Sequence, residues 1–417
     1  MRVLIVSVKH EHPDPMYRNF YASLECCADI LYYGPGYSTL SQLEKGVSEF
    51  VENNNIDIVL ITFQVYLMCP SLVNIDQVFH FHRYLMEESN VFEIMKYSEK
   101  IIYEMSKIDR NKILVFTQDY CNMSAQWETI IDCFLRQKSS FIMTWGEEFI
   151  PSVSSSNVEL FGGAVVNDSF KDLLHKYQNK VISIPFEAAG LNDIDGNGNI
   201  LEREYDWVVP GNLDPNSYPK RMQVLNNITD AGYRVYNRFI NRTLAYVYSH
   251  NDDNFYQYES DYFKSADTYI ESVYLYKKMR KDALEQWREN YRVSLRSSKI
   301  AYADGGTSLN LVSKYIIIPA HGAILFCEQI KALEVLGFRD GYNAVFASPD
   351  DVVKKTVELF ENPNKMEEIS FNGLQFVRRN HMSLNRAKNA IDCLRVILKG
   401  SFMGSFWDNG KYIIREQ

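Results

Sequence analysis

The residues Lys299-Ile-Ala-Tyr-Ala303, Asp304-Gly-Gly-Thr-Ser308 and His321-Gly-Ala-Ile-Leu-Phe326 decide the fold of this chain. The first run predicts an apolar strand and the second a turn of small and polar residues. A helix that ends near Pro319 is expected before the third run, which predicts the next strand. A helix that begins after such a turn has free backbone N–H groups at its start, and such groups bind phosphate. The order strand, turn, helix and strand therefore predicts a nucleotide-binding half-domain.

Length and charge restrict what surrounds this half-domain. The chain has 417 residues, more than one hydrophobic core usually serves, so we expect two domains. The formal net charge is -9 and no long run of Lys and Arg occurs, which argues against DNA or RNA as a partner. No run of about 18 apolar residues occurs either, so we expect no membrane span.

The cysteines indicate the compartment. The chain has seven, an odd number, and they lack the C-x-x-C spacing of metal or redox motifs. We therefore expect reduced thiols in a cytoplasmic protein. The first residues, Met1-Arg-Val-Leu-Ile-Val-Ser7, predict a buried strand rather than a signal peptide, because charged residues follow almost at once.

Residues 1–185 alternate apolar strands with longer helical patterns, which is typical of a parallel sheet covered on both faces. The strands are expected at 2–8, 28–33, 57–63, 112–117, 139–144 and 180–184. The helices are expected at 15–26, 39–54, 87–108 and 124–137. This part is the predicted N-terminal Rossmann-like domain.

A Gly- and Asn-rich segment, 186–204, has the composition of a linker between domains. The second predicted domain, 205–398, has strands expected at 205–210, 232–236, 299–303, 323–327 and 343–346. Its last helices are expected at 349–361, 365–379 and 383–398. The last helix and the tail, 399–417, are expected to cross back and pack on the N-terminal domain.

Several pieces of sequence, in this order, resemble glycosyltransferases of the GT-B fold, and among them the CgeB-like group related to spore-maturation proteins. They are Tyr33-Gly-Pro-Gly36, Tyr205-Asp206, Pro210-Gly-Asn212, Tyr218-Pro-Lys-Arg221, Ser298-Lys-Ile300, Lys314-Tyr-Ile-Ile-Ile-Pro-Ala-His-Gly322 and Asp340-Gly-Tyr-Asn-Ala-Val-Phe346. The resemblance implies two Rossmann-like domains that face each other across a cleft. It also implies a UDP-, GDP- or dTDP-sugar donor on the C-terminal domain and metal-independent transfer. The acceptor, a glycan, a lipid-linked molecule or a protein, would be held by the N-terminal domain.

Candidate donor ligands follow from this arrangement, because ligands of open α/β sheets bind beyond the carboxyl ends of the strands. They are Gly211, Asn212, Arg221, Lys299, Gly305, Gly306, Thr307, Ser308, His321 and Glu328. Arg221 or Lys299 would neutralise the donor phosphates. Ile317 stands where the resemblance implies a glutamate that holds the ribose hydroxyls, and isoleucine cannot accept their hydrogen bonds. Glu328 or a backbone carbonyl would replace it, or the donor is gripped differently, or donor binding has been lost.

A catalytic base for the acceptor hydroxyl is expected on a loop after an N-terminal strand. Asp119 follows the predicted fourth strand, and His10 and Glu11 follow the first. Asp119 could instead cap the next helix, and a reaction that retains the anomeric configuration needs no such base.

The linker contains a calcium-like loop. Asp193-Ile-Asp-Gly-Asn-Gly-Asn-Ile-Leu-Glu-Arg-Glu204 matches every specified position of the EF-hand pattern D-x-D/N-x-D/N-G-x5-E. The candidate ligands of a structural Ca²⁺ are Asp193, Asp195, Asn197, Asn199 and Glu204. The alternative is an ordinary hinge rich in Asp, Asn and Gly, because the flanking segments do not read as two helices.

The leading hypothesis is a glycosyltransferase of class EC 2.4. One alternative is a glycosyltransferase-like binding or scaffold protein that has lost donor turnover, which Ile317 favours. The other is a sugar-nucleotide epimerase, because such enzymes share the same two-domain plan.

Overall fold

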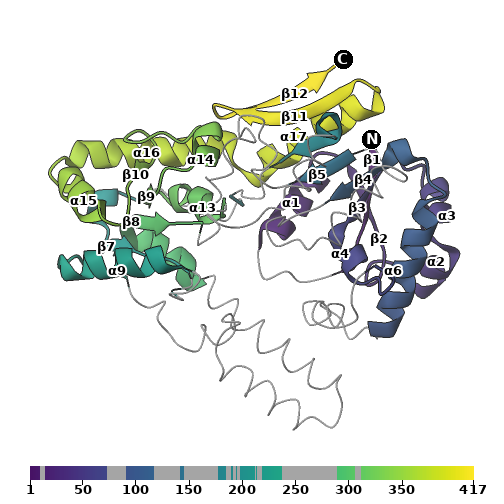
Figure 1. Cartoon of the computed structure of the whole chain (residues 1–417), viewed down its shortest axis with the longest axis horizontal. Coiled ribbons are helices and arrows are strands. Elements are labelled where there is room, and N and C mark those ends of the chain that lie inside the picture. Colours follow the sequence, from purple (N-terminus) through teal and green to yellow (C-terminus); the bar gives the residue numbers. More distant parts are fainter. Residues whose placement is uncertain are drawn as a thin grey trace, which may run out of the picture.

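The computed structural model describes residues 1–9, 15–72, 91–116, 141–144, 177–184, 189–190, 194, 198–211, 213, 218–236, 289–305 and 311–417. These residues form two parallel β-sheets, each flanked by helices, and a C-terminal β-hairpin (Figure 1). The first sheet contains the early strands and the second contains the strands that follow the linker.

The first sheet has six parallel strands in the order β2-β1-β3-β4-β5-β6. They are β1 (Arg2–Val6), β2 (Asp29–Tyr33), β3 (Ile58–Thr62), β4 (Ile113–Phe116), β5 (Phe141–Thr144) and β6 (Val181–Ser183). All six lie within or overlap the predicted ranges. The central strands β1 and β3 are runs of Val, Leu and Ile that are buried on both faces, as expected of a parallel sheet covered by helices.

The described helices around this sheet are α1 (Pro15–Glu25), α2 (Leu40–Lys45), α3 (Val47–Asn53), α4 (Phe63–Leu67) and α6 (Val91–Met105). The sequence predicts one helix over 39–54, and the structure breaks it at Gly46, whose φ is +105°. A Cβ at Gly46 would overlap the carboxylate of Glu104 on α6. The predicted helix at 124–137 lies outside the described residues.

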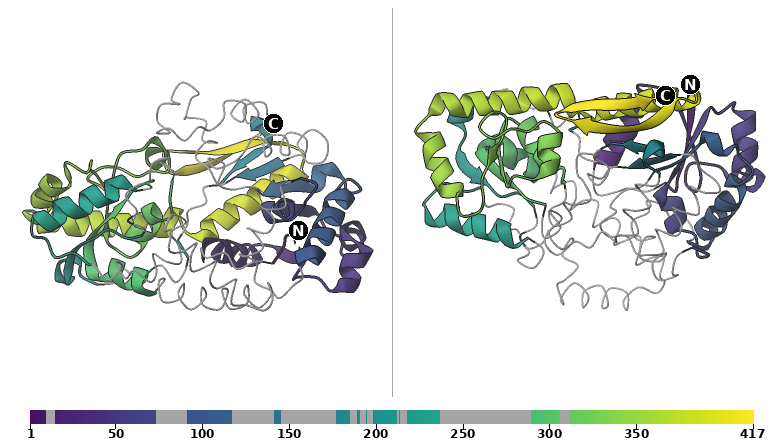
Figure 2. Two further views of the ribbon diagram at one scale, coloured as in Figure 1. Left: turned by 60° about the horizontal axis from the view of Figure 1, so that its bottom comes forward. Right: turned by 45° about the horizontal axis from the view of Figure 1, so that its top comes forward.

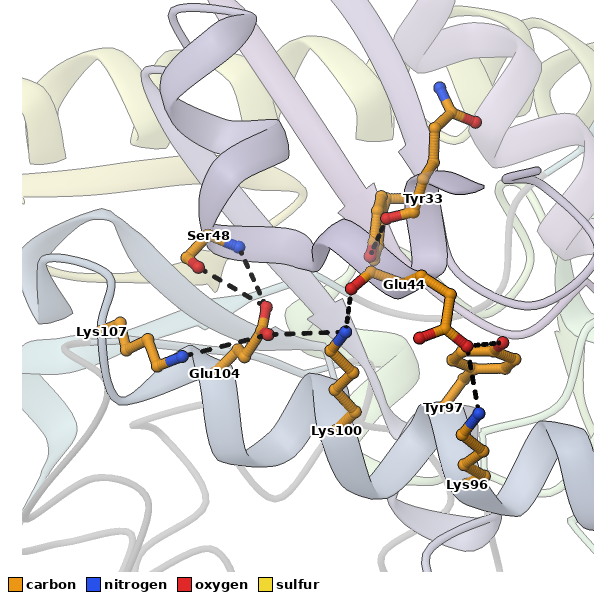
Figure 3. Close-up of polar contacts among 9 residues, drawn as sticks. Tyr33, Glu44, Ser48, Lys96, Tyr97, Lys100, Glu104 and Lys107 are labelled. Atoms are coloured by element: carbon orange, nitrogen blue, oxygen red, sulfur yellow. Dashed lines mark hydrogen bonds and ion pairs between the residues drawn. The ribbon is translucent and has the colours of Figure 1, made fainter. Parts of the chain in front are cut away.

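Polar side chains of α6 hold the break between α2 and α3 in place (Figure 3). The buried Glu104 carboxylate accepts hydrogen bonds from the Ser48 N–H, at 3.4 Å, and from its hydroxyl, at 3.5 Å, at the start of α3. The Lys100 ammonium donates to the carbonyl of Glu44 near the end of α2. An anion at a helix start and a cation at a helix end both interact favourably with the helix dipoles. We therefore assign this cluster a structural role.

The second sheet has the parallel order β10-β9-β8-β7. Its strands are β7 (Tyr205–Val208), β8 (Ser298–Ala303), β9 (Ile324–Cys327) and β10 (Val345–Phe346). Its described helices include α9 (Pro219–Asp230), α13 (Lys314–Ala320), α14 (Lys331–Val335), α15 (Val352–Phe360) and α16 (Pro363–Asn380), and residues 289–297 are also helical. The strand predicted at 232–236 is reduced to a single bridge between Val235 and Trp207.

The C-terminal helix α17 (Ser383–Leu398) crosses to the first sheet (Figures 1 and 2). It packs against α1, and its residues Ile391 and Leu394 share a hydrophobic cluster with Val3 and Ile5 of β1. The crossing of the last helix onto the N-terminal part is therefore confirmed.

The tail forms a hairpin of β11 (Phe402–Asp408) and β12 (Lys411–Glu416), where the sequence predicts only a packed segment. β11 lies against β6 and the short 3-10 helix η5 (Gln178–Lys180), and the N–H of Ser183 donates to the Ser405 hydroxyl at 3.1 Å. At the hairpin turn, the N–H of Gly410 donates to the Val335 carbonyl of α14 at 2.8 Å. The hairpin thus contacts both parts of the chain.

The chain passes between the two parts at two places, and these crossings are paired. Ala189 of the linker and Met382, between α16 and α17, form a parallel bridge. The Ala189 N–H donates to the His381 carbonyl, and the Ser383 N–H donates to the Ala189 carbonyl, both at 2.9 Å. Among the described residues, no helix is long and apolar enough to cross a membrane.

Candidate functional site

The candidate site lies where β7 and β8 end. Gly211 follows β7 closely with a φ of +104°, and Asp304 comes directly after β8. The helices α9 and α13 begin nearby, at Pro219 and Lys314. The carboxyl ends of parallel strands and the starts of the helices that follow them are the usual ligand-binding edge of an open α/β sheet.

Arg221, in the first turn of α9, is 1% exposed and held by specific contacts. Its Nε donates to Oδ1 of Asp304, and its Nη2 donates to the Asp304 carbonyl oxygen at 3.1 Å. The ring of Tyr218 covers the guanidinium, with 3.7 Å between the guanidinium carbon and the ring centre. A buried guanidinium fixed by a carboxylate and an aromatic ring has little freedom to rotate.

Lys314 approaches the same turn from the start of α13. A Cβ placed on Gly211 would lie 2.5 Å from the Lys314 ammonium nitrogen and 3.2 Å from Nη1 of Arg221. Two cations therefore converge on a backbone that only glycine allows at this distance and at this φ. Cations that converge on a glycine turn at the edge of a sheet form a suitable site for phosphate.

The structure thus brings together Gly211 and Arg221 of the predicted donor residues, with Gly305 next to Asp304. Lys299 lies at the opposite end of β8, where its ammonium pairs with Asp206 at 2.9 Å. Burial favours a higher pKa for Asp206, but hydrogen bonds from Lys299 and Arg234 outweigh it and lower the pKa. The Lys299 ammonium therefore stabilises a buried carboxylate at the amino-terminal edge of the sheet.

His321 and Glu328 lie in different settings. His321 is fully buried at the end of α13, and its Nδ1 lies 3.0 Å from the Ile317 carbonyl. Its own carbonyl accepts a hydrogen bond from Arg203 at 2.7 Å. Glu328 follows β9 and is partly exposed, and the ammonium of Lys220 lies 2.6 Å from its Oε2.

Ile317, where the resemblance implies a glutamate, is 8% exposed and belongs to the hydrophobic core of the second sheet. Its carbonyl accepts a hydrogen bond from the His321 N–H at 3.2 Å. A ribose at this place would have to be bound by other groups.

Several predicted residues lie outside the described part of the chain. They are the catalytic candidates Asp119, His10 and Glu11, the donor candidates Asn212, Gly306, Thr307 and Ser308, and the calcium candidates Asp193, Asp195 and Asn197. Of the remaining calcium candidates, Glu204 is exposed. Asn199 caps the 3-10 helix η7 (Ile200–Glu202), because its Oδ1 accepts from the Leu201 N–H at 3.0 Å. No cluster of metal-ligating side chains occurs within the described ranges.

The sequence placed Asp304 in the turn at the ligand-binding edge but not among the candidate donor ligands, and it gave no role to Tyr218 or Lys314. Alternation along β8 contains a signal for Asp304. Residues 300, 302 and 304 share one face of the strand, and Ile300 and Tyr302 pack with Val224 of α9. Lys314 had no comparable signal, because its approach to Gly211 depends on how α13 is placed in space.

Comparison with known proteins settles the fold. No family model and no curated protein matches the sequence. A glycosyltransferase from Rickettsia africae has a similar structure, with a TM-score of 0.52 and 10% identity over 96% of this chain and 99% of that one. Anabaena HepE, in complex with UDP-glucose, has a TM-score of 0.50 and 9% identity over 95% of this chain and 99% of that one. The fold is GT-B.

The GT-B fold agrees with the predicted fold class, in which two Rossmann-like halves are joined and the last helix crosses back. At this level of identity the likeness establishes the fold alone. The CgeB-like resemblance stays a prediction.

Proposed function

We propose that this protein is a glycosyltransferase that moves a sugar from a nucleotide-sugar donor to an acceptor hydroxyl. The observation that carries the proposal is the convergence of Arg221 and Lys314 on the Gly211 turn, at the ligand-binding edge of the second sheet. The GT-B fold supports it, since a structure of similar fold, HepE, binds UDP-glucose.

In the proposed reaction, the bond between the anomeric carbon and the β-phosphate oxygen breaks, and the electron pair stays on the nucleoside diphosphate. The acceptor oxygen forms the new bond to the anomeric carbon and loses its proton. The main electrostatic demand is the negative charge that develops on the leaving diphosphate. In our proposal, Arg221 and Lys314 meet this demand as cations, so that the chemistry needs no metal ion.

The remaining residues predicted from the sequence have roles in this proposal as well. Asn212 and the turn 305–308 would complete the phosphate contacts, and Asp119, His10 or Glu11 would accept the acceptor proton in an inverting reaction. Glu328 could bind the ribose only by sharing its carboxylate with Lys220. The donor base, the acceptor class and Ca²⁺ in the linker stay predictions.

We also propose a cytoplasmic location. The five cysteines that the structure describes, Cys26, Cys27, Cys69, Cys327 and Cys393, are free thiols. Free thiols are typical of a reducing compartment, and the nucleotide sugars that the proposal requires are charged metabolites that such a protein would meet there.

Ile317 favours a second candidate function, a protein that binds a nucleotide sugar without turning it over. Its side chain is part of the core and offers no acceptor for a ribose hydroxyl. This candidate predicts the same phosphate site and differs in the absence of donor hydrolysis or transfer.

The test is a screen of UDP-, GDP-, dTDP- and CMP-sugars against the whole chain, read by thermal shift and by release of the nucleotide. The nucleotide released is a nucleoside diphosphate from the first three donors and CMP from the last. We expect one donor class to stabilise the protein. Lys314→Met should weaken that donor about tenfold or more, because it removes an interaction with a charged group. Lys331→Met is the matched control, since this lysine pairs with Glu334 at 3.1 Å on α14, outside the site.

The outcomes separate the candidates. Release of the nucleotide that depends on Lys314 supports the transferase, whereas donor binding with no release supports the binding protein. If no donor stabilises the protein and none is consumed, both proposals fail.

A further inference from the structure

We propose that Asp304 and Tyr218 are positioning residues that fix the Arg221 guanidinium toward the donor diphosphate, an inference that rests on the proposed function. The sequence placed Asp304 only in the turn after β8, and neither Asp304 nor Tyr218 was among the predicted donor ligands. Both act through Arg221 and need not touch the donor themselves.

The hydrogen bonds set the plane of the guanidinium. Its Nε and Nη2 both donate to Asp304, one to the carboxylate and one to the carbonyl oxygen. Two donors of a rigid fork held by a single residue leave the third nitrogen only one direction. That nitrogen, Nη1, is the one nearest the Gly211 turn, 3.2 Å from where a Cβ would stand.

Tyr218 closes one face of the guanidinium. Its ring centre lies 3.7 Å from the guanidinium carbon, and the same ring lies 5.9 Å from the Lys314 ammonium. A cation over an aromatic face is attracted by the ring, more strongly when it is shielded from water, as Arg221 is. The ring therefore restrains Arg221 and borders the same space that Lys314 enters.

Stability alone does not explain the ion pair between Arg221 and Asp304 well. Arg221 and Asp304 are each 1% exposed, and a buried ion pair often contributes no more than well-packed apolar residues would. The second carboxylate oxygen of Asp304, Oδ2, is also buried and makes no hydrogen bond to any described residue. A buried acceptor without a hydrogen bond destabilises the folded state. The cost is understandable if the carboxylate is there to hold Arg221.

The charges agree with this assignment. Arg221 and Lys314 supply two positive charges near Gly211, and Asp304 supplies one negative charge that is turned to Nε, away from Nη1. These three described side chains together carry one net positive charge, which suits an incoming anion. Tyr302, on the same face of β8, adds no charge, because burial and then the nearby Glu328 raise the pKa of its hydroxyl.

The experiment uses the whole chain and measures the affinity for UDP and for inorganic pyrophosphate by calorimetry, together with kcat and KM for the donor found in the screen. Pyrophosphate reports on the phosphate contacts whatever the base. We expect Asp304→Asn to weaken both ligands and to lower kcat about tenfold or more, because the uncharged amide holds the guanidinium less firmly. In an Arg221→Met background, Asp304→Asn should change ligand affinity no further.

Tyr218 gives a second test that leaves the core intact, because its side chain is only partly buried. Tyr218→Leu should weaken pyrophosphate and lower kcat, whereas Tyr218→Phe keeps the ring and should behave like the wild type. The result that overturns the inference is unchanged pyrophosphate affinity and kcat in both Asp304→Asn and Tyr218→Leu while the wild type binds and turns over its donor. The proposed function would then stand. If the wild type binds no donor, UDP or pyrophosphate, the function and the inference fail together.

Discussion

Gly34→Ala should destabilise the first sheet by more than an ordinary glycine substitution. Gly34 follows β2 with a φ of +130°, and a Cβ there would overlap the Ser7 carbonyl oxygen and lie 3.1 Å from its carbonyl carbon. Both atoms are backbone at the end of β1, and the Ser7 N–H donates to the Tyr33 carbonyl at 3.0 Å. No change of side-chain conformation can relieve the overlap, so the strand ends must move apart.

The magnitude has two parts. An L-residue at positive φ costs about 1–2 kcal/mol, and forcing packed groups apart typically costs about 1–3 kcal/mol more. Gly400→Ala is the matched control, because Gly400 has a φ of +79° and nothing within 4 Å of an added Cβ. It should lose only the first part. We therefore expect a loss of about 2–5 kcal/mol for Gly34→Ala against about 1–2 kcal/mol for the control.

Urea unfolding followed by circular dichroism measures both variants, with the midpoints compared at unchanged slope. A changed slope would show that the transition is not two-state and that midpoints alone cannot be used. Equal losses of stability in the two variants would refute the reasoning, because the contact between Gly34 and Ser7 would then cost nothing.

Two further predictions concern the C-terminal segment. Burial, and then the charge of Arg386, lower the pKa of His381 well below its ordinary value. His381 therefore stays unprotonated in the folded protein at pH values at which it takes up a proton in the unfolded chain. Stability should fall as the pH drops below about 6.5, by up to about 1.4 kcal/mol per unit, and His381→Gln should flatten this slope in urea titrations; identical slopes would contradict the assignment. Deleting 401–417 removes the buried Phe402 and Trp407, each contributing about 1.5–3 kcal/mol, so the melting temperature should fall by several degrees, and an unchanged value would show that the hairpin does not stabilise the fold.

The strands could be predicted from the sequence because their signal is local. Runs such as Val3 to Val6 and Ile58 to Ile61 are short and apolar throughout, as expected of strands covered on both faces. The break at Gly46 could not be predicted in the same way. It depends on Glu104, which reaches Ser48 from 56 residues further along the chain.

In the candidate site, too, local features could be predicted from the sequence and contacts between distant residues could not. The turn after β8 was recognisable, but its chemistry depends on contacts between distant residues, such as Arg221 and Asp304, which are 83 positions apart. Lys299 belongs to the same strand and lies at its other end in space. Neighbouring positions along a strand do not tell which cation faces the ligand edge, whereas the direction of the strand does.

The bridge between Ala189 and Met382 restricts how the two halves can move. Because both connections run side by side and are hydrogen-bonded to each other, a relative rotation would bend them at one shared point. The displacement of an atom would then grow with its distance from this pivot. A rotation by a small angle would move the far end of each sheet by the largest distance. The hydrogen bond between Gly410 and Val335 is a second attachment close to the pivot, because the neighbouring Leu336 carbonyl lies 3.1 Å from Nε2 of His381. A rotation that separates Gly410 from α14 would break this hydrogen bond. The bond therefore favours the arrangement of the two halves in which Gly410 contacts α14.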